Sequence, residues 1–206
     1  MSEKTASSYD PYAALRLPAF RWFNLGRNIS GFGEAMQGVV IGWELYQRTD
    51  RPLTLGWVGL VQAFPIFLFA LHAGHVADRH ARKQIVLLSQ IVVGLCALSL
   101  ALLSSHRAGI PLFFLCLFCA GTARAFGNPA RSALLPQLVP ANILMNAISW
   151  DTSIRRTVAI CGAAVGGWLL RGHPPAFLYT LNAAFSLLSF LALLRLPNLP
   201  APEAKG

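Results

Sequence analysis

The chain has 206 residues, of which 55% are hydrophobic and only 12% are charged, and its formal net charge is +9. Soluble domains carry about 25% charged residues, so this composition excludes an ordinary soluble domain and indicates a membrane protein. The Lys and Arg residues punctuate hydrophobic stretches instead of gathering in one basic segment. That spacing argues against a nucleic-acid partner and is typical of membrane topology signals.

Residues 1–23 form a charged N-terminal segment. Acidic and basic residues are spread from Glu3 to Arg21, and the segment has neither an early apolar core nor a small-residue cleavage site. A secretory signal peptide requires both features. We therefore expect no cleaved leader and interpret residues 1–23 as a cytoplasmic segment ahead of the first membrane helix.

Four apolar stretches have the composition of membrane-crossing helices. A bilayer core of about 30 Å requires roughly 20 apolar residues in a helix. Three stretches meet this requirement without an Asp, Glu, Lys or Arg, at residues 55–76, 85–103 and 176–194. A fourth, at residues 110–126, is shorter and carries Arg124 near its end. We predict a transmembrane helix at each.

Two further stretches, residues 29–46 and 145–170, are apolar but interrupted by ionisable side chains. The first contains Glu34 and Glu44, and the second contains Asp151 and two arginines. Each such group at bilayer depth costs at least ~2.5 kcal/mol on insertion scales. The two stretches can cross the bilayer if their polar faces point into a protein interior or a watery cavity. On that condition we predict an all-α membrane protein with six transmembrane helices.

The connections and the charge distribution complete this layout. Residues 128–142 contain three prolines and are predicted to be a helix end followed by a linker on the membrane surface. With the N-terminus inside, the cytoplasmic segments hold more Lys and Arg than the outer loops, which favours two cytoplasmic termini in a bacterial inner membrane. The bundle then occupies residues 24–196. Residues 197–206 form a cytoplasmic tail or a truncated central linker.

The loop after the second predicted span reads GHVADRHARK over residues 74–83. It resembles the major facilitator signature G-x-x-x-D-R-x-G-R-R/K, in the loop where that superfamily carries it. One defined position departs, since Ala81 stands where the second glycine is usual, and alanine is disfavoured in a left-handed turn. The gating residues that the resemblance implies are Gly74, Asp78, Arg79, Arg82 and Lys83.

Further segments extend the resemblance to most of the chain. FRWFNLG at residues 20–26, GWELY at 42–46 and FGNPARSALLP at 126–136 are similar to the transmembrane secretion effector group, which includes the enterobactin exporters. The resemblance implies the N-terminal six-helix half of a rocker-switch transporter, with the substrate held between two halves. It also implies that Asp78 and the following arginines form a cytoplasmic latch on a helix N-terminus of the second half. Some members carry an arginine in helix four that aligns with Leu117, so no relay through that position is expected.

Glu34 and Gln37 are the first candidates for substrate or proton binding. They lie three residues apart on one helix face, and Arg27 lies on the same stripe. Glu34 is either a cavity-lining carboxylate that binds protons or a cationic group, or a buried residue paired with Arg27 or with another helix. Intramembrane carboxylates are usually functional, which favours the first interpretation. Glu44 lies nearer the outer end of the helix, where we expect it to be solvated.

Asp151, Arg155, Arg156 and Arg124 are the remaining cavity candidates. Asp151 and Arg155 stand four residues apart in a helix and can neutralise one another. Arg156 points about 100° away and requires another partner, either an anionic or carboxylate-bearing substrate or a phospholipid headgroup. The same choice applies to Arg124, unless its side chain extends to the cytoplasmic surface.

Small residues and cysteines are interpreted as packing groups. The G-x-x-x-G spacings at residues 38–42 and 162–166 permit close helix contacts. The C-x-x-C at residues 116–119 has no second Cys or His pair nearby at zinc-ligand spacing. We therefore expect neither a metal site nor a cofactor.

These features predict membrane transport and no enzymatic activity. An intramembrane protease requires a Ser nucleophile and a His base, typically in a Gly-x-Ser-x-Gly-like setting that the sequence lacks. We expect efflux of a small amphipathic molecule, siderophore-like or drug-like, coupled to proton entry. The expected partners are the lipid bilayer and a second six-helix half or a second copy of the chain. A non-transporting membrane scaffold and a truncated, inactive fragment are the alternatives.

Overall fold

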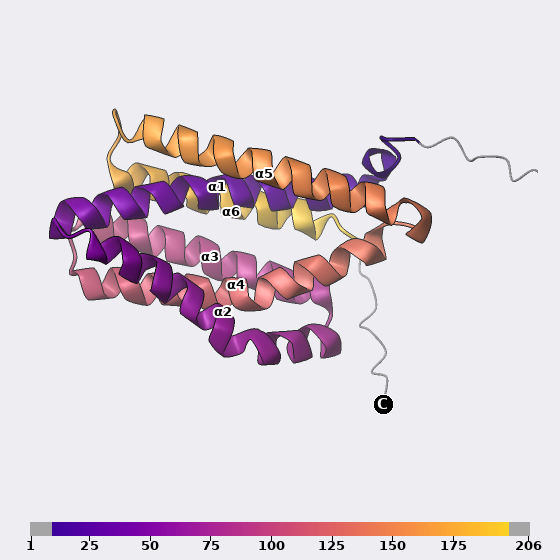
Figure 1. Ribbon diagram of the computed structural model, residues 1–206, viewed down its shortest axis with the longest axis horizontal. Coiled ribbons are helices and arrows are strands. Elements are labelled where there is room, and N and C mark those ends of the chain that lie inside the picture. Colours follow the sequence, from indigo (N-terminus) through magenta and orange to yellow (C-terminus); the bar gives the residue numbers. More distant parts are fainter. Residues whose placement is uncertain (1–9, 198–206) are drawn as a thin grey trace, which may run out of the picture.

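The computed structural model describes residues 10–197, apart from the side chains of Ala77 and Asp78. This part of the chain is all-helical (Figure 1), which confirms the predicted class. The long helices are α1 (Pro18–Thr49), α2 (Leu53–Arg79), α3 (Arg82–Ser105), α4 (Ile110–Leu138), α5 (Leu144–Leu169) and α6 (Pro175–Leu194). Two short 3₁₀ helices precede α1 and α5, namely η1 (Ala14–Arg16) and η2 (Ala141–Ile143).

Prolines and a left-handed residue set several helix boundaries. A proline lies in the first turn of α1, α4 and α6, where its missing N–H costs no intrahelical hydrogen bond. α1 ends at Asp50, whose φ of 51° is left-handed and whose N–H donates to the carbonyl of Tyr46. Asp tolerates this conformation better than most residues. The chain therefore reverses into α2 within a few residues.

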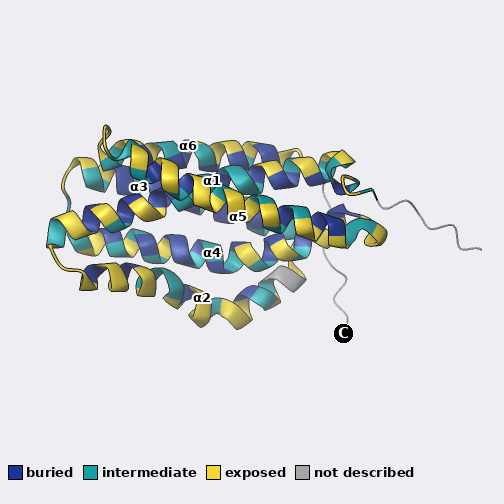
Figure 2. Cartoon of the chain, turned by 45° about the horizontal axis from the view of Figure 1, so that its top comes forward, coloured by how far each residue is buried: buried dark blue, intermediate teal, exposed yellow. Residues whose placement is uncertain are grey.

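Most neighbouring helices in the bundle are not consecutive in the sequence. Extensive contacts join α5 to α1, α1 to α6, α6 to α3, α3 to α4, and α4 to α2. α5 and α2 end this series at the two edges of the bundle (Figure 1), and α2 is mostly exposed (Figure 2). α1 also contacts α4 directly. The bundle therefore has a face, which we call the α1/α4 face, on which α1 and α4 lie between α5 and α2.

Two groups of buried apolar side chains pack the helices together. One surrounds Phe20 and Phe23 in the first turns of α1 and includes Leu134 of α4. The other lies toward the opposite end of α1, where Met36 packs with Phe113 of α4. In a bilayer such contacts act through close packing, since the lipid tails are as apolar as the side chains. Both ends of α1 are thus fixed by neighbours distant in the sequence.

Small residues bring α1 and α5 into close contact. A Cβ placed on Gly162 would lie 2.6 Å from the carbonyl oxygen of Phe32, and one on Gly166 would lie 2.9 Å from that of Met36. Only glycine fits at these separations, so the predicted close packing of this pair is confirmed. The same prediction is wrong for Gly38, beside which the described structure has open space.

α4 continues through two prolines that the sequence pattern assigns to a linker. Pro129 and Pro136 both lie inside the helix, so the helix end predicted within residues 128–142 extends to Leu138 and the linker is shorter than expected. A proline within a helix removes one hydrogen bond and distorts the preceding turn. The packing of this segment outweighs that cost, because Leu134 and its neighbours are buried in the core.

Four helices are long and apolar enough to cross a bilayer, namely α2 over Leu53–Val76, α3, α4 and α6. Their outer surfaces are apolar, and Phe67 and Leu71 of α2 are more than four-fifths exposed (81% and 88%). α1 and α5 carry more charged residues, but their 32 and 26 residues are also sufficient in length. At 1.5 Å per residue they extend about 48 and 39 Å, against a bilayer core of about 30 Å.

Candidate functional site

An ion pair joins α1 to α4 on the α1/α4 face. Arg124 Nη1 lies 3.6 Å from Glu34 Oε2, and Arg124 Nη2 donates to Gln62 Oε1 at 2.9 Å. Ser30 Oγ donates to Glu34 Oε1 at 3.0 Å. The Arg124 and Glu34 side chains are 18% and 20% exposed, so both remain within reach of solvent. Glu34 is therefore not paired with Arg27, and Arg124 turns inward instead of extending to the surface.

A second ion pair joins α1 to α5. Arg27 Nη1 lies 3.1 Å from Asp151 Oδ2 and 3.2 Å from Asp151 Oδ1. Asp151 is buried, whereas Arg155 is exposed and forms no ion pair with the described residues. The predicted pairing of Asp151 with Arg155 is therefore wrong. The short Asp151 side chain is held inside the α1–α5 contact, so the guanidinium that reaches it comes from the facing helix.

Arg131 of α4 is a buried cation with a neutral partner. Its Nη2 donates to Gln90 Oε1, and Gln90 Nε2 in turn donates to Ser30 Oγ at 2.6 Å. Arg131 is 8% exposed, and its Nε is buried without a hydrogen-bond partner. No carboxylate of the described residues lies at ion-pair distance from it. Glu34 attracts it and Arg124 repels it from farther away.

The predicted set therefore omits part of this network. Ser30, Gln62, Gln90 and Arg131 were not among the sequence candidates, although all four contact a candidate or each other. Gln62 and Gln90 could have been identified from the sequence, because an amide inside an apolar span must find a polar partner. No such indication existed for Arg131, since the prolines around it indicated a surface linker.

Gln37 belongs to a different contact. Its Oε1 accepts a hydrogen bond from Asn182 Nδ2 at 2.5 Å, and both side chains are buried between α1 and α6. Although the two residues are three apart, Gln37 bonds to α6 and Glu34 pairs with α4. The structure therefore does not bring these two candidates together.

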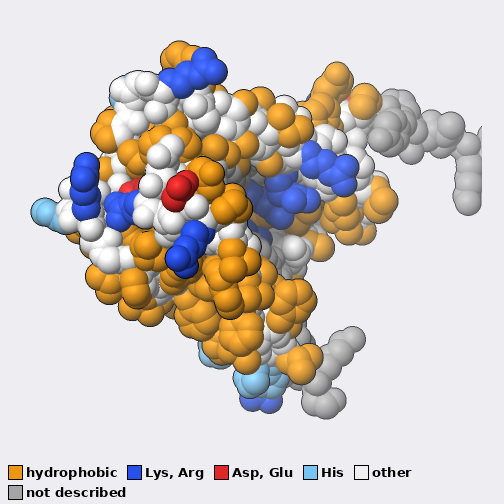
Figure 3. Space-filling view, turned by 60° about the vertical axis from the view of Figure 1, so that its left-hand side comes forward, with side chains coloured by type: hydrophobic (Ala, Val, Ile, Leu, Met, Phe, Trp, Pro, Cys, Tyr) orange, Lys and Arg blue, Asp and Glu red, His pale blue; other side chains and the backbone are white. Residues whose placement is uncertain are grey.

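Arg155 and Arg156 lie on the exposed side of α5. Arg155 is close enough to Arg27 for electrostatic repulsion. Neither Arg155 nor Arg156 has an ion pair or side-chain hydrogen bond within residues 10–197. Figure 3 shows Lys and Arg side chains lying in a hollow between bodies of hydrophobic side chains. Basic groups are thus available on a recessed surface that is otherwise framed by apolar ones.

Glu44 forms a separate buried cluster at the end of the bundle opposite the 74–83 loop. It accepts hydrogen bonds from Arg48 Nη2 at 2.5 Å, Ser104 Oγ at 2.7 Å and Tyr179 Oη at 2.8 Å. Glu44 is only 4% exposed, so the expectation that it is solvated is wrong. Because α1, α3 and α6 all contribute a donor, the cluster ties three helix ends together.

Two residues of the signature loop contact the ends of other helices. Arg82 Nη1 donates to the carbonyl of Ala133 at 2.8 Å. Lys83 Nζ donates to the carbonyls of Leu194 at 3.1 Å and Leu196 at 2.5 Å. The last carbonyls of a helix lack intrahelical partners, and a nearby cation satisfies them. The start of α3 is thereby tied to α4 and to the end of α6.

The other loop candidates point away from these contacts or lie outside the description. Gly74 has open space beside it, and Arg79 is exposed in the last turn of α2. The side chain of Asp78 lies outside the described residues. Within the described part of the chain, no group of His, Cys, Asp and Glu is arranged to hold a metal ion.

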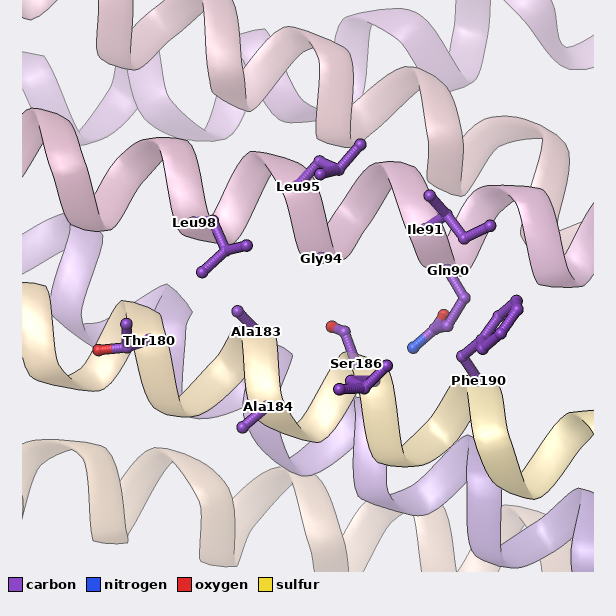
Figure 4. A pocket seen from close by; sticks show the side chains of 11 residues that line it. Gln90, Ile91, Gly94, Leu95, Leu98, Thr180, Ala183, Ala184, Ser186 and Phe190 are labelled. Atoms are coloured by element: carbon purple, nitrogen blue, oxygen red, sulfur yellow. The ribbon is translucent and has the colours of Figure 1, made fainter.

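A groove of about 460 Å³ lies between α3 and α6 (Figure 4). Its lining includes Leu95, Leu98 and Leu187, which are all substantially exposed on the outer surface. Gln90 lies at one end, but its amide is already engaged by Ser30 and Arg131. The groove therefore presents an apolar surface suited to lipid, and the charged groups lie on the α1/α4 face.

The sequence matches the family described as transmembrane secretion effector over residues 9–204. The chain belongs to this family, within the major facilitator superfamily. The enterobactin exporter EntS of Salmonella choleraesuis is 30% identical to it over 190 residues, and EntS of Shigella boydii serotype 18 is 29% identical over 187 residues. Each alignment covers 90% of this chain and 45% of the relative. The chain thus spans about half the length of the curated relatives it matches.

Membership in this family explains the arrangement described above. A secretion effector is a membrane transporter and not an enzyme. The bacterial exporter relatives and the four apolar helices together indicate a multi-pass protein of the bacterial inner membrane. In transporters, ionisable residues inside the membrane mark substrate and ion pathways. The α1/α4 face, which carries Glu34 and Arg124, is therefore the candidate functional site.

Proposed function

We propose that the chain forms a six-span half of an efflux transporter for small amphipathic molecules, with both termini in the cytoplasm. The family and the exporter relatives support outward transport. α1 and α5 complete the six spans in this proposal, because Glu34 and Arg27 of α1 and Asp151 of α5 are paired with other helices. Ion pairing removes much of the cost of such residues at bilayer depth.

The observation that carries the proposal is the pair between Glu34 and Arg124. Its 3.6 Å separation is long for an ion pair, and both groups keep partial exposure on the α1/α4 face. Protonation of Glu34 would remove its attraction to Arg124. α4 could then move relative to α1. A carboxylate that gains and loses a proton while changing its partner can couple proton entry to a change between two transporter conformations.

A second six-helix unit completes the proposed transporter, either on the same polypeptide, on another chain or as a second copy. The length of the relatives supports this requirement, since the chain corresponds to about half of each. The unit would close over the α1/α4 face, with α2 and α5 at its edges. Gly74, Asp78 and Arg79 would form the cytoplasmic latch toward it, while Arg82 and Lys83 anchor the loop to α4 and α6.

Proteoliposomes test this function. The chain is reconstituted alone or with its second half, and the flux of the neutral fluorescent amphipath N-phenyl-naphthylamine is followed with and without a pH gradient. We expect gradient-driven flux that Glu34→Gln abolishes, because glutamine cannot release a proton. Asp50→Asn is the matched control, since it removes a carboxylate from an exposed turn and Asn tolerates a positive φ. Flux that is insensitive to both the gradient and Glu34→Gln would contradict the proposed coupling.

A further inference from the structure

The positive charges on and beneath the α1/α4 face outnumber the carboxylates that can neutralise them. Glu34 is paired with Arg124, and Asp151 is paired with Arg27. Each of these carboxylates therefore already has a cationic partner. Arg131 and the exposed arginines of α5 are left without one in the described structure.

Arg131 shows the imbalance at a buried position. It is 8% exposed, its hydrogen bond goes to the neutral amide of Gln90, and its Nε has no partner. A buried charge without a counter-charge costs several kcal/mol, and proteins usually retain one only where pairing or function compensates. Glu34 attracts Arg131 only at long range and is shared with Arg124. The guanidinium thus keeps an excess positive potential next to the face.

Arg155 shows the same imbalance on the exposed side of α5, which crosses the bilayer in the proposed transporter. It is the twelfth residue of α5, so it lies about 17 Å along the helix from Leu144, roughly half of a core about 30 Å thick. A guanidinium exposed to lipid at that depth is costly, so such groups usually face a protein interior or a watery cavity. Arg155 is also repelled by Arg27, which in turn is repelled by Arg131. Water or an anion at the exposed Arg155 guanidinium therefore suits it better than lipid does.

We propose that the substrate class is anionic, a small amphipathic molecule that carries a carboxylate, sulfonate or phosphate group. This inference rests on the proposed transport function and adds the sign of the substrate's charge. The anionic group binds on the α1/α4 face in the positive potential of Arg131 and Arg27, with Arg155 as its accessible donor. The apolar part of the molecule contacts the hydrophobic side chains that frame the hollow (Figure 3). Arginine is well suited to this role, because its planar fork donates charge-assisted hydrogen bonds to such oxygens.

A matched pair of fluorescent probes tests the sign of the charge. Anilinonaphthalene sulfonate and N-phenyl-naphthylamine share one aromatic skeleton and differ by the sulfonate. Saturable binding of each is measured to the full chain in phosphatidylcholine nanodiscs, after subtraction of protein-free discs. We expect the sulfonate to bind about tenfold more tightly than the amine. Equal affinities, or tighter binding of the amine, would overturn the proposal.

Substitution of single arginines tests whether they cause the preference for the sulfonate over the amine. Arg155→Gln is expected to weaken sulfonate binding about tenfold and to leave amine binding unchanged within about twofold, since one charge-assisted donor is lost. Arg171→Gln is the matched control, because Arg171 is exposed in the turn before α6. Arg131→Gln is a second variant, and Arg155→Gln remains decisive if the buried substitution prevents folding. Equal effects of Arg155→Gln on both probes would contradict a role in charge recognition.

Two further measurements distinguish a substrate site from a lipid site and from an anion site without transport. If phosphatidylglycerol in the nanodiscs competes away the sulfonate preference, the arginines bind lipid headgroups and the substrate proposal fails. Flux of the neutral amine tests the transport function separately. If amine flux depends on Glu34 but the sulfonate does not bind more tightly, only the proposal of an anionic substrate is overturned. A sulfonate preference with no flux of either probe would leave the anion site standing and overturn the proposed transport.

Discussion

Removal of one hydroxyl group tests whether the Glu44 cluster stabilises the bundle. Tyr179 is fully buried, and its Oη donates to Glu44 Oε2 at 2.8 Å. Arg48 and Ser104 donate to the other carboxylate oxygen, Oε1. Tyr179→Phe keeps the ring and its packing but leaves Oε2 of a buried carboxylate without a donor. The substitution therefore isolates a single hydrogen bond between α6 and α1.

The expected magnitude follows from two limits. Hydrogen bonds between transmembrane helices average ~0.6 kcal/mol and reach ~1.7 kcal/mol. Hydrogen bonds to charged groups contribute ~1.5–3 kcal/mol in proteins generally. A charged acceptor that loses the donor on one of its oxygens belongs at the upper end of the membrane range. We therefore expect Tyr179→Phe to lower the free energy of unfolding by about 1.5 kcal/mol, roughly a tenfold change in the equilibrium constant.

Reversible unfolding in mixed micelles measures this difference. Sodium dodecyl sulfate is titrated into the chain in a mild detergent, and helix content is followed by circular dichroism. Tyr46→Phe is the matched control, since Tyr46 is 39% exposed on α1 and its hydroxyl has no hydrogen-bond partner in the described part of the chain. A loss below about 0.5 kcal/mol for Tyr179→Phe, less than an average interhelical bond, would refute the reasoning. Equal losses for the two variants would do the same.

The remaining stability predictions concern α5. Gly166→Leu is expected to separate α5 from α1 and to lower the free energy of unfolding by at least ~1–3 kcal/mol, because its Cβ meets backbone. Gly38→Leu, which enters open space, is the control, and equal losses would contradict the close contact. Asn146→Ala should detach the segment before α1 from α5, because the Asn146 amide donates to the Pro11 carbonyl at 2.7 Å and accepts from the Ala14 N–H at 3.3 Å. Faster tryptic cleavage of that segment would report the detachment, and unchanged cleavage would show that other contacts hold it.

Hydropathy alone predicted the four most apolar helices but missed that α4 continues to Leu138. The four most apolar stretches coincide with α2, α3, α4 and α6, because lipid-facing positions demand apolar residues irrespective of tertiary contacts. The end of α4 was missed because proline is a local signal for a break. Whether Pro129 breaks the helix depends on burial of the following residues against α1 and α3, which local composition does not encode.

The candidate residues were found more readily than their partners. Glu34, Asp151 and Arg124 stand out as ionisable groups within apolar segments, a signal that requires no structure. Asp151 was paired with Arg155 from spacing along one helix, and the structure pairs it with Arg27 of another helix instead. Glu44 was expected to be solvated because it lies near the end of its helix, but donors 60 and 135 positions away help to bury it. Sequence spacing within a helix cannot supply contacts of that range.

The order of neighbours in the bundle has a consequence for biogenesis. Among consecutive long helices, only α3 and α4 pack extensively on one another in the described structure. α1 emerges from the ribosome before α2–α6, yet Glu34 finds its partner on α4, Arg27 on α5, and Glu44 one of its donors on α6. The polar groups of α1 therefore enter the membrane before the groups that satisfy them have been synthesised. α1 is thus fully stabilised only after α4, α5 and α6 have been made and packed against it.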